Sequence, residues 1–419
     1  MHLNEPTIAP SENEEYVADA TQVIEIKLVD SLDNLTQQKS YSPEFVHQHF
    51  GQAETIVGYK NLKIIVCYSD LTLFIYPIFT FDKMVKGGDI VPDDIENKIL
   101  DQLPSTQLDA LITDSNKFAE KLRAQRTFQP PGQLIYNFSI KDKHNKNRLF
   151  QLHKLEGDCD NEAIRFLERA QSLAFWYIDA VNYTDHDDPR FFNYFLFENS
   201  TDPESNSRLT FAGYSSLYRF YHHPDQDRVR ISHILVAPSH RHSGIGSRFL
   251  NAIYQDLWKD ERVYDITAEM PADLFIYMRD YVDCVNCCEL AEFSKDNLVK
   301  GFSRAMRLKA RERFKIFHDQ ARRVYEILRL ANTNVCRADE LAAFKADVCN
   351  RLERPLLRSK RDYTKMRKAL NPSELAVVQE TNDPETRRRL VDDLYANTRA
   401  AYDVVIKRLR RFEAKKFCR

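Results

Sequence analysis

The amino-acid sequence predicts a mixed α/β protein with a helical C-terminal region, and three patterns lead to this fold class. Between residues 23 and 155, short runs alternate apolar and polar side chains, as β-strands do. Residues 231–269 contain a buried strand, a glycine-containing loop, an amphipathic helix and a returning strand. Beyond about residue 293 only helical periodicity continues, with dense arginine and lysine.

These changes of pattern divide the 419 residues into four predicted parts. Residues 1–20 are polar and acidic, which predicts a flexible tail. An α+β domain follows over 21–155, then the domain with the strand–loop–helix unit over 156–292, and a basic helical domain over 293–419. The apolar runs are too short to span a bilayer, and the N-terminus lacks a signal-peptide pattern, so we expect a protein of the cytosol or nucleus without membrane partners.

In the N-terminal domain, residues typical of turns and of helix starts separate the predicted elements. A Gly87-Gly88 pair marks a turn, and acidic residues open a helix at 92–103. The predicted strands are VIEIKLV (23–29), NLKIIVCY (61–68), LTLFIYPIFTF (71–81), LIYNFSI (134–140) and RLFQLHKL (148–155), the last two forming a hairpin.

The second domain begins with a helix predicted over 161–181, where apolar residues recur on one face. Two strands follow, FFNYFLFE (191–198) and FAGYSSLYRFY (211–221). The strand ISHILVAP (231–238) leads into the loop RHSGIG, and VYDITAE (263–269) returns after the helix.

The loop from Arg241 to Gly246 opens a helix whose Ile245, Phe249 and Ile253 fall at four-residue steps on one face. Glycines at a helix start let a phosphate approach the backbone, where unpaired N–H groups and the helix dipole hold negative charge. Arg241 adds a positive charge. The pattern therefore predicts a pyrophosphate site, with an ordinary helix N-terminus as the alternative.

The returning strand places Val263, Asp265, Thr267 and Glu269 on one face, and Pro271 ends it. Glu269 is thus a carboxylate at a strand end beside the proposed cofactor cleft. Removing the proton of a lysine ammonium at neutral pH costs roughly 4–5 kcal/mol. A nearby carboxylate can accept that proton. The alternative is a strand-end glutamate in a surface salt bridge.

The cysteines and the charge distribution give weaker signals. Cys284 and Cys287 form a C-x-x-C without a second pair at zinc spacing, so we expect free thiols and no metal, with a zinc site as the alternative. Residues 301–419 carry 30 basic and 16 acidic side chains, and residues 1–300 carry 30 and 46. The acidic part suits a cationic substrate or is simply a solvated surface.

The Arg-x-x-Gly-x-Gly spacing is similar to the acetyl-CoA signature of the GCN5-related N-acetyltransferase (GNAT) superfamily. Longer stretches resemble one family within it, the type B histone acetyltransferase catalytic subunits. They are VIEIKLV, HQHFGQAETIVGYKNLKI (47–64), DITAE (265–269), FSKDNLVKGF (293–302) and KIFHDQARRVYEILRL (315–330). The resemblance covers about 20–330, and the C-terminal helices more weakly.

This resemblance implies a GNAT fold with an N-terminal α+β domain and a helical C-terminal region. It implies transfer of acetyl from acetyl-CoA to lysines in the tail of free, newly synthesised histone four, present with its pairing histone. It further implies a WD40-propeller histone chaperone as partner, and residence in nucleus and cytoplasm.

Site residues also follow from the resemblance, position by position. Glu269 corresponds to the general base and Asp179 to a second acidic residue that assists it. The positions that correspond to cofactor contacts are Ile234, Leu235, Val236, Arg241, His242, Ser243, Gly244, Ile245, Gly246, Ser247 and Tyr281. Those that correspond to histone-tail contacts are Gln52, Ala53, Glu54, Phe191, Tyr218, Arg219 and Phe220.

The sequence departs from the family at several of these positions. Met270 stands where aspartate is usual, Asp179 where glutamate is typical, and Phe191 where tryptophan is usual. The loop reads RHSGIG where the family prefers glutamine and a GHG pattern. Loss of an aspartate next to Glu269 removes a like charge that favours proton uptake. A catalytically weakened histone-binding adaptor in a chaperone complex is therefore the alternative function.

Two charged segments have open interpretations. The loop with Asp185, Asp187 and Asp188 either borders the tail groove or is a solvated turn. The arginines at 387–389 and Arg408 form a solvated helical face, a nuclear-import patch or a nucleic-acid site. Since no reader motif accompanies them, we expect no nucleic-acid partner.

Overall fold

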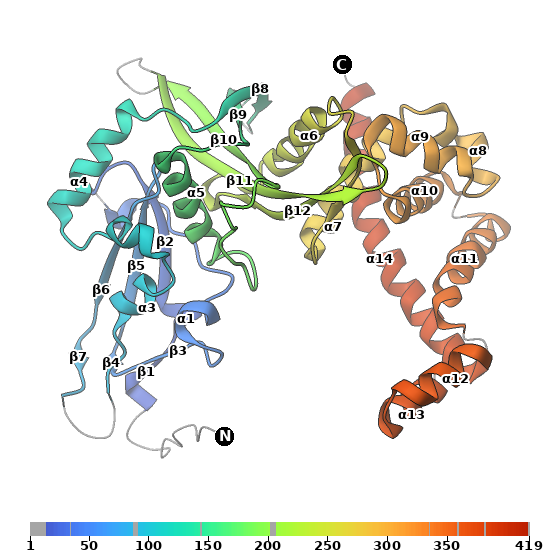
Figure 1. Ribbon diagram of the computed structural model, residues 1–419, viewed down its shortest axis with the longest axis horizontal. Helices are drawn as coiled ribbons and strands as arrows, with labels where there is room; N and C mark the ends of the chain where they lie inside the picture. The colour runs from blue at the N-terminus through green and yellow to red at the C-terminus, as the bar shows by residue number, and fades with distance from the viewer. Residues whose placement is uncertain are drawn as a thin grey trace. The chain divides into compact units, whose positions relative to one another are not determined.

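The computed structural model describes residues 14–33, 35–86, 91–142, 145–201, 207–334, 336–357, 360–380 and 383–417 (Figure 1). The chain forms two compact units, one of residues 1–220 and 229–253 and the other of residues 221–228 and 254–419. Of the predicted tail, residues 1–13 lie outside the described residues, as does the Gly87-Gly88 pair. Residues 17–19 form a strand, so regular structure begins before the predicted boundary at residue 20.

The N-terminal part of the first unit is built on a three-stranded sheet. Strand β2 (Ile24–Val29) is parallel to β5 (Lys63–Ser69), which is antiparallel to β6 (Ile75–Thr80). These strands, blue in Figure 1, confirm the three predicted from alternation. Shorter pairs join β1 (Val17–Asp19) to β3 (Thr55–Val57) and β4 (Tyr59–Lys60) to β7 (Lys83–Met84). The helices are α1 (Ala20–Val23), α2 (His47–Phe50), α3 (Ile95–Leu100) and α4 (Ser115–Ala124).

A larger sheet has the order β13-β12-β11-β10-β9-β8. The predicted hairpin is confirmed as β8 (Gln133–Lys141) and β9 (Asn147–Leu155), and β10 (Phe191–Thr201) pairs antiparallel with β9 and with β11 (Ser207–His222). β12 (Gln226–Val236) crosses the unit boundary, because residues 226–228 belong to the second unit with β13 (Val263–Ala268).

Helix α5 (Asn161–Ala174) ends seven residues before the predicted end at 181. The backbone N–H groups of Glu44 and Phe45 donate to the Trp176 carbonyl at 2.8 and 3.2 Å, so that carbonyl is not available for a helical bond. Trp176 is fully buried, its indole N–H donates to Tyr68, and its ring stacks on His49 at 3.8 Å. Tertiary packing therefore ends the helix where periodicity alone would continue it.

The second unit is helical, as predicted, over its described residues beyond 293. Its helices are α7 (Asp273–Cys287), α8 (Lys295–Val299), α9 (Arg304–Phe314), α10 (His318–Asn332), α11 (Ala338–Glu353), α12 (Lys360–Ala369), α13 (Pro372–Glu380) and α14 (Pro384–Phe417). Short 3-10 helices span Glu14–Tyr16, Leu35–Gln37, Ser105–Ala110, Gln125–Thr127, Pro238–His240, Ala291–Phe293 and Arg354–Leu356 across the two units.

A buried carboxylate joins three of these helices. Glu326 of α10 is fully buried and accepts hydrogen bonds from Arg322, from Arg351 of α11 and from the Tyr402 hydroxyl of α14. Removing one partner of such a group would leave an uncompensated charge inside the protein. In the same unit, the indole of Trp258 donates to the Phe314 carbonyl at 2.9 Å. Among the described residues, no helix has both the length and the apolar composition needed to cross a bilayer.

Candidate active site

The predicted cofactor loop leaves the end of β12 and enters helix α6 (Ile245–Leu257). Its backbone adopts left-handed values at His242 (φ 62°) and Gly244 (φ 81°). Glycine suits the second position because it has no Cβ to clash in that region. The predicted apolar face of α6 is confirmed, since Ile245, Phe249 and Ile253 are all buried. The first-turn N–H groups of such a helix have no intrahelical acceptors, which fits a diphosphate.

The side chain of Arg241 contacts three residues of the first unit. Its guanidinium pairs with Glu44, donates to the Val236 carbonyl at 3.1 Å and stacks over the Tyr177 ring at 4.5 Å. Glu44 and Tyr177 were not predicted as site residues. They are 197 and 64 positions away in sequence, so no local motif could have identified them.

The strand segment before the loop is half-buried at Ile234 and Val236, and buried at Leu235. A close backbone approach holds it against β11. A Cβ added to Gly213 would lie 2.4 Å from the Leu235 carbonyl oxygen, and the Ala237 N–H donates to the Ala212 carbonyl at 2.9 Å. Glycine at 213 is therefore required by space rather than by its dihedral angles. The three residues predicted to face pantetheine thus lie on a strand of fixed position.

In the second unit, Glu269 is exposed directly after β13. The strand is anchored on both sides of its end. Arg228 forms a two-point pair with buried Asp265 at 2.6 and 2.8 Å, and buried Arg279 donates to the Ile266 carbonyl at 2.7 Å. Met270, which follows Glu269, is 96% exposed. The carboxylate is therefore accessible on a rigid support.

Tyr281, predicted to contact the cofactor, lies on α7 of the same unit. Its ring is half-buried, and the Arg408 guanidinium of α14 lies 4.0 Å from the ring centre. The predicted cofactor residues are divided between the units, with Tyr281 in the second and the strand and loop positions in the first.

The first unit brings Asp179 and Glu54 to the same histidine. His47 Nε2 lies 3.3 Å from Asp179, and its Nδ1 lies 3.7 Å from Glu54. Asp179 is 65% exposed, and Gln52 and Ala53 are exposed beside Glu54. A predicted tail-binding residue and the predicted assisting acid are therefore both next to His47, which no sequence motif marks as a site residue.

The remaining predicted tail-binding residues form an aromatic cluster. Phe191 meets Tyr218 edge-on at 4.7 Å, and Tyr218 lies 4.6 Å from Phe220, which is 38% exposed. Arg219 points elsewhere, pairing with Glu156 at 2.8 Å and lying over Phe192. The structure thus gathers three of these residues and directs the fourth to a structural ion pair.

The acidic loop contributes one residue to this cluster. Asp188 accepts from Tyr218 at 3.1 Å and pairs with Arg190 at 2.7 Å. Hydrogen bonds from Arg190 lower the pKa of Asp188 to about 2, so it is ionised at neutral pH. Asp185 and Asp187 are exposed, as expected of a solvated turn.

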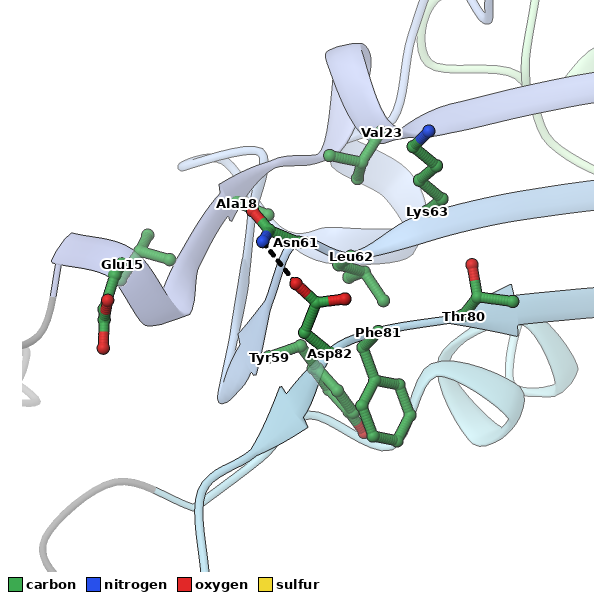
Figure 2. Close-up of a pocket in the computed structure, with 11 residues that line it drawn as sticks. Glu15, Ala18, Val23, Tyr59, Asn61, Leu62, Lys63, Thr80, Phe81 and Asp82 are labelled. Carbon is green, nitrogen blue, oxygen red and sulfur yellow. Dashed lines mark hydrogen bonds between the residues drawn. The ribbon is translucent and has the colours of Figure 1, made fainter.

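The C-x-x-C pair lies on α7, the helix that also carries Tyr281. Cys284 and Cys287 are buried, and burial raises the pKa of each thiol well above its ordinary value. Within the described ranges, no group of three or more His, Cys, Asp or Glu side chains is arranged to hold a metal ion. The N-terminal part contains a pocket of about 700 Å³. Tyr59, Phe81 and the hydrogen-bonded pair Asn61 and Asp82 form part of its lining (Figure 2). It contains none of the predicted site residues.

Comparison with known proteins covers most of the chain. Residues 16–179 match the family model "Histone acetyl transferase HAT1 N-terminus", 152–272 match the acetyltransferase (GNAT) family, and 279–330 match "Histone acetyltransferase type B catalytic subunit, C-terminal". The chain is 31% identical to the histone acetyltransferase type B catalytic subunit of Homo sapiens over 94% of each chain. The corresponding Rattus norvegicus protein gives the same values.

A more distant relative is the type B catalytic subunit DDB_G0275159 of Dictyostelium discoideum, 29% identical over 69% of this chain and 65% of that protein. Among solved structures, the xEco2 acetyltransferase domain bound to a CoA conjugate is 16% identical, with a TM-score of 0.21 over 30% of this chain and 84% of that one. That likeness is too slight to bear on function.

Proposed function

Because the chain belongs to the family of histone acetyltransferase type B catalytic subunits, we propose that it acetylates lysines in the tail of free, newly synthesised histone four. Its GNAT domain and its relatives make it an acetyl-CoA-dependent histone acetyltransferase. The choice of histone four, the role of Glu269 and the partners are our proposals. The accessible Glu269 carboxylate on an anchored strand end is the observation that carries the mechanism.

In this mechanism Glu269 takes one proton from the substrate lysine ammonium, which frees the nitrogen lone pair for attack. Acetyl-CoA supplies the activated acetyl group as a thioester. The Arg241 guanidinium and the N-terminus of α6 would hold its diphosphate, and the backbone of Ile234 to Val236 would bind the pantetheine arm. The new C–N bond replaces the C–S bond of the thioester, and the second proton of the nitrogen passes to the leaving thiolate. The products are the acetylated lysine amide and CoA, and the proton on Glu269 passes to solvent.

The histone tail carries many lysines and arginines, which suits the excess of 46 acidic over 30 basic residues in 1–300. We place Phe191, Tyr218 and Phe220 along the stems of its side chains, with Glu54 and Asp179 near its charges. Asp179 corresponds to the family's second acidic residue, and we assign it the role of assisting Glu269 in removing the proton. A WD40-propeller histone chaperone as partner, and residence in nucleus and cytoplasm, complete the proposal.

The decisive experiment measures acetyl transfer to a histone-four tail peptide by wild type and Glu269→Gln. We expect kcat to fall about 10²- to 10⁴-fold, with KM for acetyl-CoA little changed, because the amide cannot accept the proton. Glu261→Gln is the matched control, since Glu261 is an exposed glutamate just before β13. Equal rates for wild type and Glu269→Gln would exclude this role for Glu269. A histone-three tail peptide at equal concentration tests the choice of substrate.

The exposed Met270 and the short side chain of Asp179 favour a second candidate, a histone-binding adaptor with a weakened catalytic site. This candidate predicts tail binding without turnover. A calorimetric titration that detects no acetyl-CoA binding would favour it, and measurable turnover would exclude it.

A further inference from the structure

A chain of hydrogen-bonded polar side chains connects the sheet to the start of the cofactor loop. Arg148 of β9 forms two hydrogen bonds, both of 2.7 Å, to Glu198 of β10. Glu198 in turn lies 3.0 Å from Nε2 of His240, the last residue of the 3-10 turn that precedes Arg241. His240 is 6% exposed, and its ring meets the buried Phe150 edge-on. The sheet is thus connected to the loop through one buried histidine.

The protonation of this chain follows from its contacts. Burial alone would raise the pKa of Glu198, but the hydrogen bonds and charges of Arg148 and His240 outweigh burial and lower the pKa to about 2. Glu198 is therefore a carboxylate and can only accept. His240 Nε2 must then carry a hydrogen and donate it. The remaining ring nitrogen, Nδ1, lies 2.7 Å from the Ser239 hydroxyl and is its acceptor when the ring is neutral.

The backbone of His240 completes the connection to the loop. Its N–H donates to the Ala237 carbonyl at 2.8 Å, and its carbonyl accepts from the Ser243 hydroxyl at 2.8 Å. Ser243 lies between the two left-handed residues of the loop, His242 and Gly244. A contact at His240 therefore restrains the segment whose N–H groups must converge on a diphosphate.

Stability alone is a poor reason for this arrangement. Taking an ionised pair out of water costs free energy that the mutual attraction repays only in part, and apolar residues of similar volume often serve as well. A fully satisfied polar network instead specifies one geometry. A binding loop held in one geometry loses less conformational freedom when its ligand arrives.

We propose that His240, held by Glu198 and Arg148, is a positioning residue that presets the cofactor loop for the diphosphate of acetyl-CoA. The inference rests on the proposed assignment of residues 241–247 to cofactor binding. His240 does not touch the cofactor in this scheme. It acts through the backbone of the loop, so its loss affects affinity for CoA and not the chemical step.

The test is a calorimetric titration of the full-length protein with CoA, together with steady-state kinetics on a histone-four peptide. For His240→Ala we expect Kd for CoA and KM for acetyl-CoA each to rise about tenfold, the loss expected for one charge-assisted hydrogen bond. We expect kcat and KM for the peptide to stay unchanged. His240→Gln, whose amide can still donate to Glu198, should recover most of the affinity. Glu198→Gln removes the charge at constant volume and should weaken CoA binding as well.

Glu168→Gln is the matched control, because Glu168 is a buried carboxylate that accepts from Thr106 and Gln107, two residues outside the loop. It should lower the melting temperature without changing CoA affinity. The inference is overturned if wild type binds CoA and His240→Ala binds it equally well, or if His240→Gln is as weak as His240→Ala. A wild type that does not bind CoA would overturn the cofactor site itself.

Discussion

The guanidinium of Arg241, at the start of the cofactor loop, forms an ion pair with Glu44, a residue of the N-terminal domain. The Glu44 side chain is about half exposed, and the Arg241 guanidinium lies over the Tyr177 ring. The N-terminal domain therefore places a negative charge, that of Glu44, next to the arginine proposed to bind the diphosphate. A carboxylate in this position competes with phosphate for the same cation.

Glu44→Gln should for this reason tighten CoA binding by up to about fivefold, the worth of a surface ion pair. Arg241→Gln should weaken it, because the diphosphate loses its fixed counter-charge. Calorimetric titration with CoA at low and high salt measures both changes. Glu25→Gln, at an exposed position of β2, should have no effect. Weaker binding by Glu44→Gln would mean that Glu44 orients Arg241 instead of competing for it.

Gly213→Ala should destabilise the protein by about 1–3 kcal/mol, because the new methyl group would lie 2.4 Å from the Leu235 carbonyl oxygen and force the strands apart. Since that carbonyl belongs to the segment proposed to face pantetheine, CoA affinity should fall too. Urea unfolding and CoA titration measure the two effects. An unchanged free energy of unfolding would show that β11 and β12 separate without cost.

Met270→Asp should raise kcat on the histone peptide and move the acidic limb of the pH–rate profile to higher pH. A second negative charge beside Glu269 favours the state in which Glu269 holds a proton. Because Met270 is 96% exposed, water screens part of this effect. Met270→Asn has a similar size without the charge and should leave the profile in place. Identical profiles for the two variants would rule out a charge effect.

Asp283→Asn should change how stability depends on pH. Burial raises the pKa of Asp283 to about 7, more than Arg279 lowers it, whereas the unfolded value is about 4. Between these values the native state holds a proton that the unfolded chain has released. Wild type should therefore lose stability relative to the variant as pH rises from about 4 to about 7, by up to about 1.4 kcal/mol per pH unit.

Urea unfolding at several pH values in this range measures that difference. It should be constant above about pH 7, where Asp283 is ionised in both states of the wild type. A difference that does not vary with pH would place the proton elsewhere, for instance on Asp280, whose pKa burial also raises.

Local sequence patterns predicted the elements that are determined by residues close to one another in the chain. The alternation at 23–29 specified β2, and the steps Ile245, Phe249 and Ile253 specified the buried face of α6. The end of α5 could not be found this way, because Phe175, Trp176 and Tyr177 extend the apolar periodicity. Only the distant N–H groups of Glu44 and Phe45 show why the helix stops.

The site shows the same division. The glycine spacing placed the loop correctly at a helix start, since a phosphate-type loop is defined within six residues. Glu198 and Glu44, which pair with residues at the start of this loop, lie 42 and 197 positions from their partners His240 and Arg241. Contacts over such separations depend on how strands and domains pack, which no pattern within the loop encodes.

The two tryptophans of the chain give each unit its own optical reporter. Trp176 is enclosed in the first unit between His49 and Tyr68, and Trp258 lies against Phe314 in the second. Their emission should therefore respond separately when either unit unfolds. Replacing Trp258 by phenylalanine would leave tryptophan emission from the cofactor-loop unit alone, so that its melting, and its stabilisation by CoA, could be followed without any added label.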